Sequence, residues 1–463
     1  MISYWKNGSI EQDSPLSNTE TLLEFLRESK RLTGTKEGCA SGDCGACTVV
    51  LVSLDDNERL KYEAVNSCLM PVAELAGKAL ITIEDLAQGD DLHPLQQAFI
   101  DQHASQCGFC TPGFILSALA LKKHESNPDV EAIDEALGGN LCRCTGYSPI
   151  VKAVQLADCS QDRFAQCEVE LINSLKQLQN STASVVGFHQ PRTLEALCEL
   201  KSEHPEAILL SGGTDWMLRA TQGLEQVETL ISTDRVAGLN QLTLVAGHWS
   251  VGAAVSLSRI KDQAKASGFH ALDQLLSRFA SQQIRNRATL GGSIGNASPI
   301  GDLAPLMLAL DAELVLSSVQ QERRVALKHF FLGYKQTALS SDEVISQINF
   351  NLADQAQVHF EKVSKRLDDD ISAVAVATHY RMHEGQLTSL RIGLGGMAAT
   401  PVLALGVMAA FEGKEPSSIT LDQVTDALGE LTPLSDLRAS ADYRLKACAR
   451  VIHFHLISAK ESV

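Results

Sequence analysis

The chain has 463 residues, of which 44% are apolar, so it is long enough for several domains that each bury a hydrophobic core. Lysine and arginine number 39 against 56 aspartates and glutamates, which gives a formal net charge of −17. This acidic balance excludes nucleic acid and anionic membrane surfaces as main partners, because both recruit basic proteins.

The cellular compartment bears on how the cysteines are interpreted. The amino terminus, MISYWKNGSI, has no basic stretch followed by an apolar core, and no run of about 18 apolar residues predicts a membrane span. We therefore expect a cytoplasmic, reducing location. Twelve cysteines in such a compartment favour metal or redox chemistry over disulfides.

Residues 1–78 predict a β-rich domain with one helix. The stretch ISYWKNGSI alternates around Asn7 and Gly8, which is typical of a hairpin with a two-residue turn. TLLEFLRES then has apolar residues at helical spacing, and CTVVLVSL is typical of a buried strand.

Residues 79–158 predict a helical domain. Two amphipathic segments, HPLQQAFIDQHASQCGFC and TPGFILSALALKKH, meet at a cysteine pair, and Pro112 suits the first turn of the second helix. DVEAIDEAL predicts a further helix, which the pair Gly138 and Gly139 ends.

The remainder divides into three parts. Residues 159–184 are polar at both ends and predict a linker with a possible helix in its middle. Residues 185–350 alternate strands such as AILLSGG with helices such as FHALDQLLSRFAS, an α/β pattern. Residues 351–463 form a smaller α+β segment, so the whole chain is predicted to be a multidomain α+β protein.

The first cysteine set comprises Cys39, Cys44, Cys47 and Cys68. Its spacing, C-x4-C-x2-C-x20-C, matches the plant-type [2Fe–2S] pattern. Glycines between the cysteines allow the loop to curl closely around a cluster and to offer N–H groups to sulfur. A structural zinc site is the alternative, but zinc ribbons usually show two C-x2-C pairs.

The second cysteine set comprises Cys107, Cys110, Cys142 and Cys144, with the spacing C-x2-C-x31-C-x-C. One pair lies where two helices meet, and helix N-termini stabilise thiolates. Zinc is a better rival here than in the first set. The other four cysteines match no ligand spacing and are predicted to be ordinary free thiols: Cys159, Cys167, Cys198 and Cys448.

Two glycine-rich loops mark the α/β part. ILLSGGTDWML, from Ile208 to Leu218, is a strand entering a Gly-Gly turn, which presents backbone N–H groups to a diphosphate or is merely a structural turn. ATLGGSIGNASPIGDLAP does not fit the Rossmann fingerprint. Its Ser293, Asn296 and Ser298 are candidate donors to phosphate or ribitol oxygens, and Asp302 is a candidate for a ribose or ribitol hydroxyl.

Together the two cysteine sets resemble the iron–sulfur half of the molybdenum hydroxylases, the xanthine dehydrogenase and aldehyde oxidase family. The resemblance covers residues 1–158. It implies a β-grasp ferredoxin-like domain followed by an all-α helical domain, each of which binds one [2Fe–2S] cluster. The helical-domain cluster would then lie nearer the molybdenum.

The two glycine loops, in this order, resemble the FAD-binding domain of the same family, an α/β domain of the carbon monoxide dehydrogenase flavoprotein type. FEKVSKRLDDDISAVAVA and LRIGLGGMAATPV resemble its α+β C-terminal flavoprotein domain. The resemblance implies the following FAD contacts: Leu209, Leu210, Ser211, Gly212, Gly213, Thr214, Asp215, Trp216, Phe279, Thr289, Leu290, Gly291, Gly292, Ser293, Asn296, Asp302 and Lys365. Taken alone, Phe279 is more simply a core residue of an amphipathic helix.

For several polar residues near the C-terminal motifs, the sequence leaves two roles open. Lys365 and Arg366 are candidates for the cofactor or its acceptor edge, or form a solvated basic pair. Asp368, Asp369 and Asp370 are expected in a charged surface turn. Val402 and Leu403 stand where many members carry a basic residue, which leaves flavin tuning and acceptor choice open.

The resemblance implies a function in electron transfer. No segment resembles a molybdopterin domain, so we expect substrate oxidation on a large molybdopterin-binding partner, in an (αβ)2 heterotetramer like that of bacterial two-chain xanthine dehydrogenases. Electrons would pass through two [2Fe–2S] clusters and FAD to NAD+, with no catalytic side chain. The alternatives are the redox subunit of another molybdenum hydroxylase, for aldehydes or N-heterocycles, a stand-alone NADH reductase, and a zinc-stabilised binding module.

Overall fold

The computed structural model describes residues 1–352 and 356–459, and the chain divides into two bodies. The first body comprises Met1–Pro191, Glu206–Asp234 and Ala280–Ala288. The second comprises Arg192–Pro205, Arg235–Phe279 and Thr289–Val463. The segment expected to form one α/β domain therefore contributes to both bodies.

The first body begins with a five-stranded sheet in the order β2-β1-β5-β3-β4. Its strands are β1 (Ile2–Lys6), β2 (Ser9–Asp13), β3 (Thr48–Leu54), β4 (Leu60–Asn66) and β5 (Ala79–Ile81). The predicted hairpin is present, because β1 pairs antiparallel with β2 through Asn7 and Gly8, whose φ angles of 48° and 93° are left-handed. β1 also pairs in parallel with β5.

A short helical segment packs on one face of this sheet. It consists of α1 (Leu22–Glu24), capped by Thr21, followed directly by a π-helical turn over Phe25–Ser29. Its apolar side chains join the hydrophobic cluster of Val49 and Leu51 from β3, as the helical spacing predicted. This packing fixes the loop that leads into the first cysteine set.

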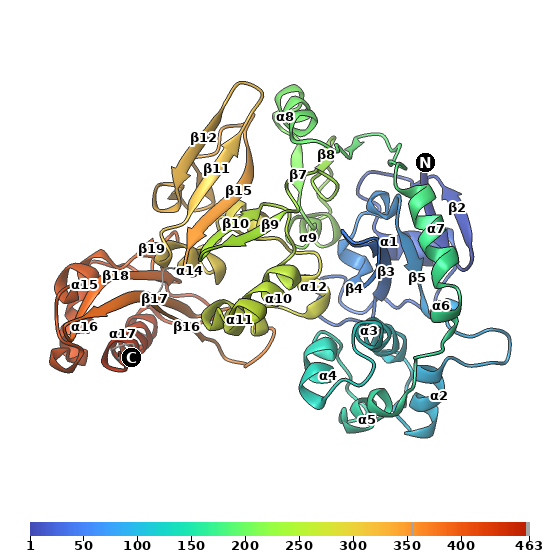
Figure 1. Ribbon diagram of the computed structural model, residues 1–463, viewed down its shortest axis with the longest axis horizontal. Helices are drawn as coiled ribbons and strands as arrows, with labels where there is room; N and C mark the ends of the chain where they lie inside the picture. Colours follow the sequence, from blue (N-terminus) through green and yellow to red (C-terminus); the bar gives the residue numbers. More distant parts are fainter. Residues whose placement is uncertain (353–355, 460–463) are drawn as a thin grey trace. The chain divides into compact units, whose positions relative to one another are not determined.

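The other face of the sheet is covered by helices (Figure 1). They are α2 (Pro94–Asp101), α3 (Thr111–His124), α4 (Val130–Leu137) and α5 (Ser148–Leu156). Phe114 and Leu119 of α3 share one buried cluster with Val50 and Val52 of β3. The sheet and the helical part are therefore joined by a continuous hydrophobic core.

The expected linker is mostly helical. It contains α6 (Arg163–Gln166) and α7 (Glu168–Leu178), and the predicted helix in its middle is confirmed. Leu171, Leu175 and Leu178 lie four and three residues apart and are buried in the same cluster as Val50. The segment is thus packed on the core of the first body.

The first body also holds a small parallel sheet in the order β6-β8-β7. Its strands are β6 (Phe188–His189), β7 (Ile208–Leu210) and β8 (Leu230–Ser232). The first body also contains the short helices α9 (Trp216–Thr221) and α12 (Gln282–Arg285). Because β7 runs directly into the first glycine loop, this sheet positions the loop within the first body.

The second body contains a five-stranded antiparallel sheet in the order β12-β11-β15-β10-β9. Its strands are β9 (Leu242–Val245), β10 (His248–Gly252), β11 (Glu313–Ser317), β12 (Glu322–Ala326) and β15 (Val344–Asn351), with a small ribbon of β13 (Phe331–Gly333) and β14 (Gln336–Thr337). The helices of this part are α8 (Leu194–Glu203), α10 (Leu257–Ser267), α11 (His270–Ser277), α13 (Leu290–Gly295) and α14 (Leu303–Ala309).

The second body ends in a four-stranded antiparallel sheet, β16-β17-β18-β19, with helices packed on it (Figure 1). The elements are β16 (Gln357–Val363), β17 (Val374–His383), β18 (Gln386–Gly395), β19 (Val402–Leu403), α15 (Leu405–Phe411), α16 (Leu421–Ala427) and α17 (Ala441–Ile457). None of the helices in the described residues has the length and apolar character needed to cross a bilayer.

Two histidines lie side by side where α17 packs on this C-terminal sheet, the half-buried His359 on β16 and the buried His455 on α17. The ring centroids of His359 and His455 are 5.3 Å apart, and each ring has a hydroxyl partner at 3.1 Å, Tyr380 for His359 and Thr378 for His455. Burial and the neighbouring His359 lower the pKa of His455 from 6.5 to about 4, and burial lowers that of His359. Both rings are therefore neutral at neutral pH.

This pair predicts an acid-sensitive C-terminal domain. A folded pKa below the unfolded value contributes stability above pH 6.5, and the contribution is lost as pH falls toward 4. Each pKa unit corresponds to about 1.4 kcal/mol. We expect thermal denaturation between pH 7 and 4, followed by circular dichroism, to show a steep fall that His455→Gln flattens. The exposed His383→Gln is the control; an unchanged slope in the His455 variant would contradict the prediction.

Candidate iron–sulfur and flavin sites

The first cysteine set lies at one end of the β3–β4 pair. Cys39, Cys44 and Cys47 belong to the loop before β3, and Cys68 lies in the turn after β4. Because β3 and β4 are antiparallel, with Thr48 opposite Asn66, the flanking cysteines meet. The sulfurs of Cys47 and Cys68 are 3.3 Å apart, and the thiols of Cys39 and Cys44 are hydrogen-bonded.

Glycines and N–H donors shape this loop around sulfur. A Cβ on Gly38 would lie 2.7 Å from the sulfur of Cys44, so the close approach requires glycine. The N–H of Ser41 donates to the sulfur of Cys39 at 3.4 Å. The pKa of Cys39 falls to about 4, chiefly because its sulfur accepts a hydrogen bond from Cys44. The pKa of Cys44, the donor in this pair, is raised in turn, so the pair holds negative charge on Cys39 and not on both sulfurs.

The second cysteine set forms where the loops before α3 and α5 meet. Cys107 is hydrogen-bonded to Cys144, and Cys110 to Cys142, so residues more than thirty positions apart come together. Cys110 is the N-cap of α3. The Oγ1 of Thr145 lies 3.2 Å from the sulfur of Cys142, and its N–H donates at 3.5 Å. Burial opposes a thiolate at Cys142, but these bonds hold its pKa below the usual value.

The two sets differ in exposure. Cys47 and Cys68 are buried, whereas Cys107 and Cys144 are exposed, next to Phe109 at 47% exposure. The sets are also linked through the backbone, because the N–H of Leu141 donates to the carbonyl of Cys44 at 3.0 Å. The other two cysteines of each set are half-buried, so the first set extends from the interior toward the surface, and the second set lies at the surface.

The donor chemistry of both sets fits iron–sulfur clusters. None of the twelve cysteines, all of which lie in the described residues, forms a disulfide, and each set offers four sulfurs beside N–H or hydroxyl donors. Four thiolates alone also fit zinc. The geometry supports a metal centre at each set.

The first glycine loop leaves β7 through two left-handed residues. Gly212 and Gly213 have φ angles of 81° and 79°. A Cβ on Gly212 would lie 1.8 Å from the carbonyl oxygen of Arg287, so no other residue fits there. Ser211 and Thr214 flank the turn and are half-buried, and Asp215 is exposed.

This loop packs against the first cysteine set. Leu210 and Met217, on either side of the turn, share a buried cluster with Cys47, Cys68 and Leu69. Trp216 packs against the same cluster. The turn predicted to bind diphosphate is therefore in direct contact with the elements that carry two of the thiols.

The second glycine loop lies in the second body. Thr289 caps α13 by accepting the N–H of Gly292 at 3.0 Å. Gly291 is buried, and a Cβ there would lie 2.5 Å from that of Ala253. Ser293 is half-buried on α13, and Asn296 caps its C-terminal end. The sequence predicted no helix at this position.

Phe279 lies outside the amphipathic helix that precedes it. α11 ends at Ser277, and Phe279 is half-buried, unlike Leu275 and Leu276 on that helix. This placement does not suit the interpretation as a helix core residue. It leaves the ring partly accessible, as the predicted flavin contact requires.

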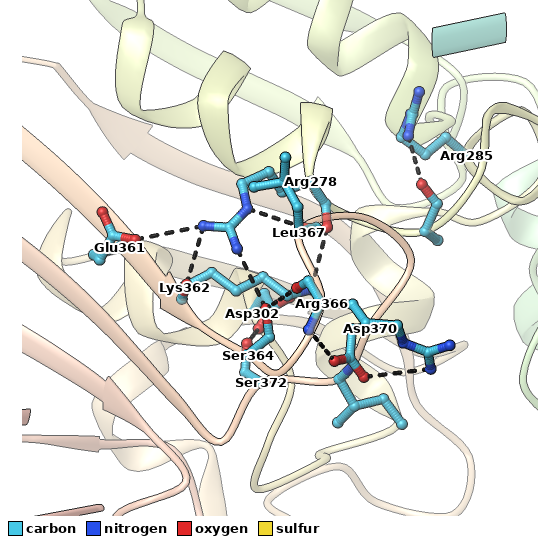
Figure 2. A network of polar contacts seen from close by, with 12 residues as sticks. Arg278, Arg285, Asp302, Glu361, Lys362, Ser364, Arg366, Leu367, Asp370 and Ser372 are labelled. Atoms are coloured by element: carbon cyan, nitrogen blue, oxygen red, sulfur yellow. Dashed lines mark hydrogen bonds and ion pairs between the residues drawn. The ribbon is translucent and has the colours of Figure 1, made fainter. Parts of the chain in front are cut away.

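Asp302 has a buried partner that the sequence analysis missed. Its Oδ2 lies 2.8 Å from the Nζ of Lys362, and its Oδ1 accepts the hydroxyl of Ser372 at 2.5 Å (Figure 2). Both members of the ion pair are at least 95% buried by side chain. The sequence did carry a signal for this buried lysine. Lys362 follows the buried Phe360 by two residues on β16, and residues two apart on a strand point to the same face.

Lys365, the lysine favoured from the sequence, is exposed, and its Nζ donates to the carbonyl of Leu437 at 3.3 Å. Arg278 is a second residue that sequence reasoning missed. Its guanidinium donates to the carbonyls of Lys362 at 3.0 Å and Leu367 at 3.2 Å (Figure 2). It thereby anchors the loop that carries Lys365.

Four family models match successive parts of the chain. Residues 7–73 match the 2Fe-2S iron-sulfur cluster binding domain, and residues 82–155 the [2Fe-2S] binding domain. Residues 181–350 match the FAD binding domain in molybdopterin dehydrogenase, and residues 359–457 the CO dehydrogenase flavoprotein C-terminal domain.

Curated relatives include several xanthine dehydrogenases. That of Emericella nidulans is 31% identical over 89% of this chain and 35% of its own length. That of Drosophila subobscura is 32% identical over 99% of this chain and 38% of its own length. Xanthine dehydrogenase 1 of Arabidopsis thaliana is 34% identical over 76% of this chain and 31% of its own length. The chain thus spans about a third of the length of these relatives.

Solved structures with the same fold include a carbon monoxide dehydrogenase from Hydrogenophaga pseudoflava, with a TM-score of 0.54 at 26% identity. The match covers 58% of this chain and 94% of that one. Quinoline 2-oxidoreductase from Pseudomonas putida 86 has a TM-score of 0.52 at 27% identity, covering 59% and 95%.

Proposed function

The chain belongs to the molybdenum hydroxylase family as an iron–sulfur and FAD electron-transfer member, and on this premise we propose that it serves a xanthine dehydrogenase. In this proposal it passes electrons from a molybdopterin-binding partner to NAD+. The xanthine dehydrogenase relatives support xanthine as the substrate oxidised on the partner. The chain binds two [2Fe–2S] clusters and FAD.

The observation that carries this proposal is the packing of the first glycine loop on the first cysteine set. Leu210 and Met217 lie in one buried cluster with Cys47 and Cys68. If the loop binds the diphosphate of FAD there, the cofactor is held beside the elements that carry Cys47 and Cys68. This supports electron transfer between FAD and the first cysteine set.

The cysteine and FAD contacts predicted from the sequence are proposed as the residues that hold these groups. When bound, the clusters carry single electrons, and FAD collects two and delivers a hydride. The chain itself supplies ligands, position and electrostatics. Thr145 and Ser41 stabilise charge at sulfur, and the hydrophobic cluster around Cys68 excludes water.

The two exposed cysteines of the second set support a partner at that surface. Cys107 and Cys144 lie beside the exposed Phe109 and Leu141, an apolar rim that suits a protein contact. We propose that the molybdopterin chain covers it, in an (αβ)2 complex located in the cytoplasm.

Purification of the complex tests this function. We expect co-expression with a molybdopterin-binding xanthine dehydrogenase chain to give a stable complex that contains molybdenum and reduces NAD+ with xanthine. A complex that oxidises aldehydes or N-heterocycles, but not xanthine, would favour the second candidate, which the quinoline 2-oxidoreductase likeness supports. A lone chain with full NADH reductase turnover would count against both.

The electron acceptor gives a separate prediction. We expect anaerobic NADH to bleach the flavin absorbance of the purified chain within the mixing time of a cuvette experiment, because hydride transfer to bound FAD is reversible. The clusters should then bleach in turn. NAD+, the oxidised form of the coenzyme, serves as the control because it has no hydride to donate. Flavin that stays oxidised under NADH but is reduced by dithionite would exclude NAD+ as the acceptor.

A further inference from the structure

A short segment of the first body, Gln283–Arg287, contacts both cysteine-bearing parts of the chain. Gln283 is fully buried, and its Nε2 donates to Ser117 and Asn140, both at 2.9 Å. The Nδ2 of Asn286 donates to the carbonyl of Ala64 in β4 at 2.9 Å. We call Gln283–Arg287 the anchor segment.

The remaining polar residues of the anchor segment form ion pairs. Arg285 lies 2.8 Å from Glu135 of α4. Arg287 pairs with Glu74, a completely buried carboxylate in the turn Val72–Leu75. Each polar side chain thus reaches a different element of the iron–sulfur part, which is more than a connecting segment needs for its own stability.

Arg287 also holds the first glycine loop. Its Nε and Nη2 both lie 3.3 Å from the carbonyl oxygen of Gly212, and its own carbonyl fills the space where Gly212 lacks a Cβ. On the other side, a Cβ on Gly213 would lie 3.0 Å from the carbonyl of Leu69, the neighbour of Cys68. The turn is therefore clamped between Arg287 and the first cysteine set.

The orientation of the Arg287 guanidinium is fixed by a network of hydrogen bonds and ion pairs around Glu74. The hydroxyl of Ser232 donates to Glu74 at 2.5 Å, and its oxygen lies 3.0 Å from Asp234. Asp234 in turn pairs with Lys78 at 2.7 Å. Because this network links β8 to the turn Val72–Leu75, Arg287 keeps one orientation. A guanidinium held in this way is a rigid donor to the Gly212 carbonyl.

We propose that Arg287 is a positioning residue that fixes the Gly212–Gly213 turn on the ferredoxin-like domain, so that the turn is preorganised to bind FAD. This rests on the proposed FAD contacts of the loop. Losing charge-assisted hydrogen bonds of this kind should weaken FAD binding by about tenfold to a hundredfold. The iron–sulfur ligands are not involved.

The test compares Arg287→Ala and Arg287→Lys with the wild-type chain after removal of FAD. We expect the alanine variant to keep its full iron content, to bind FAD about tenfold or more weakly, and to exchange the amide hydrogens of residues 209–216 faster. Lysine, which can pair with Glu74 but has no guanidinium fork, should restore binding in part. Unchanged FAD affinity and exchange in a folded alanine variant would overturn the proposal.

Three further variants guard the interpretation. If Arg287→Ala loses iron and folding, the double variant Glu74→Gln/Arg287→Met removes both charges together, and wild-type FAD affinity in it would overturn the proposal. Arg323→Ala breaks a comparable pair with Glu343 in the second body and should leave FAD affinity unchanged. If Thr214→Val also leaves FAD affinity unchanged, the assignment of the loop itself fails.

Discussion

Cys68→Ser is expected to lower bound iron from about four atoms per chain to about two, with one of the two cluster signals lost. Cys68 contributes a buried sulfur 3.3 Å from that of Cys47, and serine is a poor ligand for a diiron cluster. The second set has its own four thiols and should keep its iron. Iron analysis with visible circular dichroism and electron paramagnetic resonance measures the loss.

A variant of the second set and a control substitution outside both sets complete this experiment. Cys107→Ser should remove the other signal, because Cys107 lies in the exposed set with Cys144. Cys167→Ser changes a half-buried thiol outside both sets and should keep all the iron. Loss of both signals from either single variant, in a chain that still folds, would contradict two independent centres.

Lys362→Met is expected to destabilise the second body by about 3–5 kcal/mol. The substitution keeps the apolar stem but leaves the carboxylate of Asp302 buried without its cation, 2.8 Å from where the ammonium was. The cost comes from an unpaired buried charge. Urea denaturation followed by fluorescence or circular dichroism gives the free energy of unfolding.

The double variant Asp302→Asn/Lys362→Met should recover most of this loss, because neither charge remains to be solvated. Lys365→Met is the matched control, since it removes an exposed ammonium three residues along and should change the free energy by less than about 0.5 kcal/mol. Equal effects of the two lysine substitutions would show that the Asp302 pair is not stabilising.

Local sequence signals predicted much of the secondary structure. The turn at Asn7 and Gly8 was predictable because few dihedral angles close a two-residue hairpin. The helix over Val130–Leu137 followed from apolar periodicity and from the end signal at Gly138. The helix over Thr111–His124 was signalled by Pro112, but the prediction that it is amphipathic was wrong, because it is buried all round from Gly113 to Ala120. The short helix Leu290–Gly295 was missed, because its glycines hide the helical pattern.

The polar pairs were not predictable to the same degree. Lys362 and Lys365 are lysines only three residues apart, yet Lys365 is exposed and Lys362 is buried against Asp302. The alternation of side chains along a strand indicates that every second residue is buried, but which residues these are is decided only when β16 pairs with β17. In the same way, no local rule connects Arg287 with Glu74.

The sequence by itself determined the chemistry of this protein. Spacing places thiols at fixed steps along short loops, where chain geometry leaves little freedom, so two four-cysteine sets could be recognised. Only the tertiary structure decided that Cys107 meets Cys144, that Cys47 and Cys68 are buried, and that the Gly212 turn is held by Arg287. These contacts join residues far apart in the chain, and the packing of whole elements selects them.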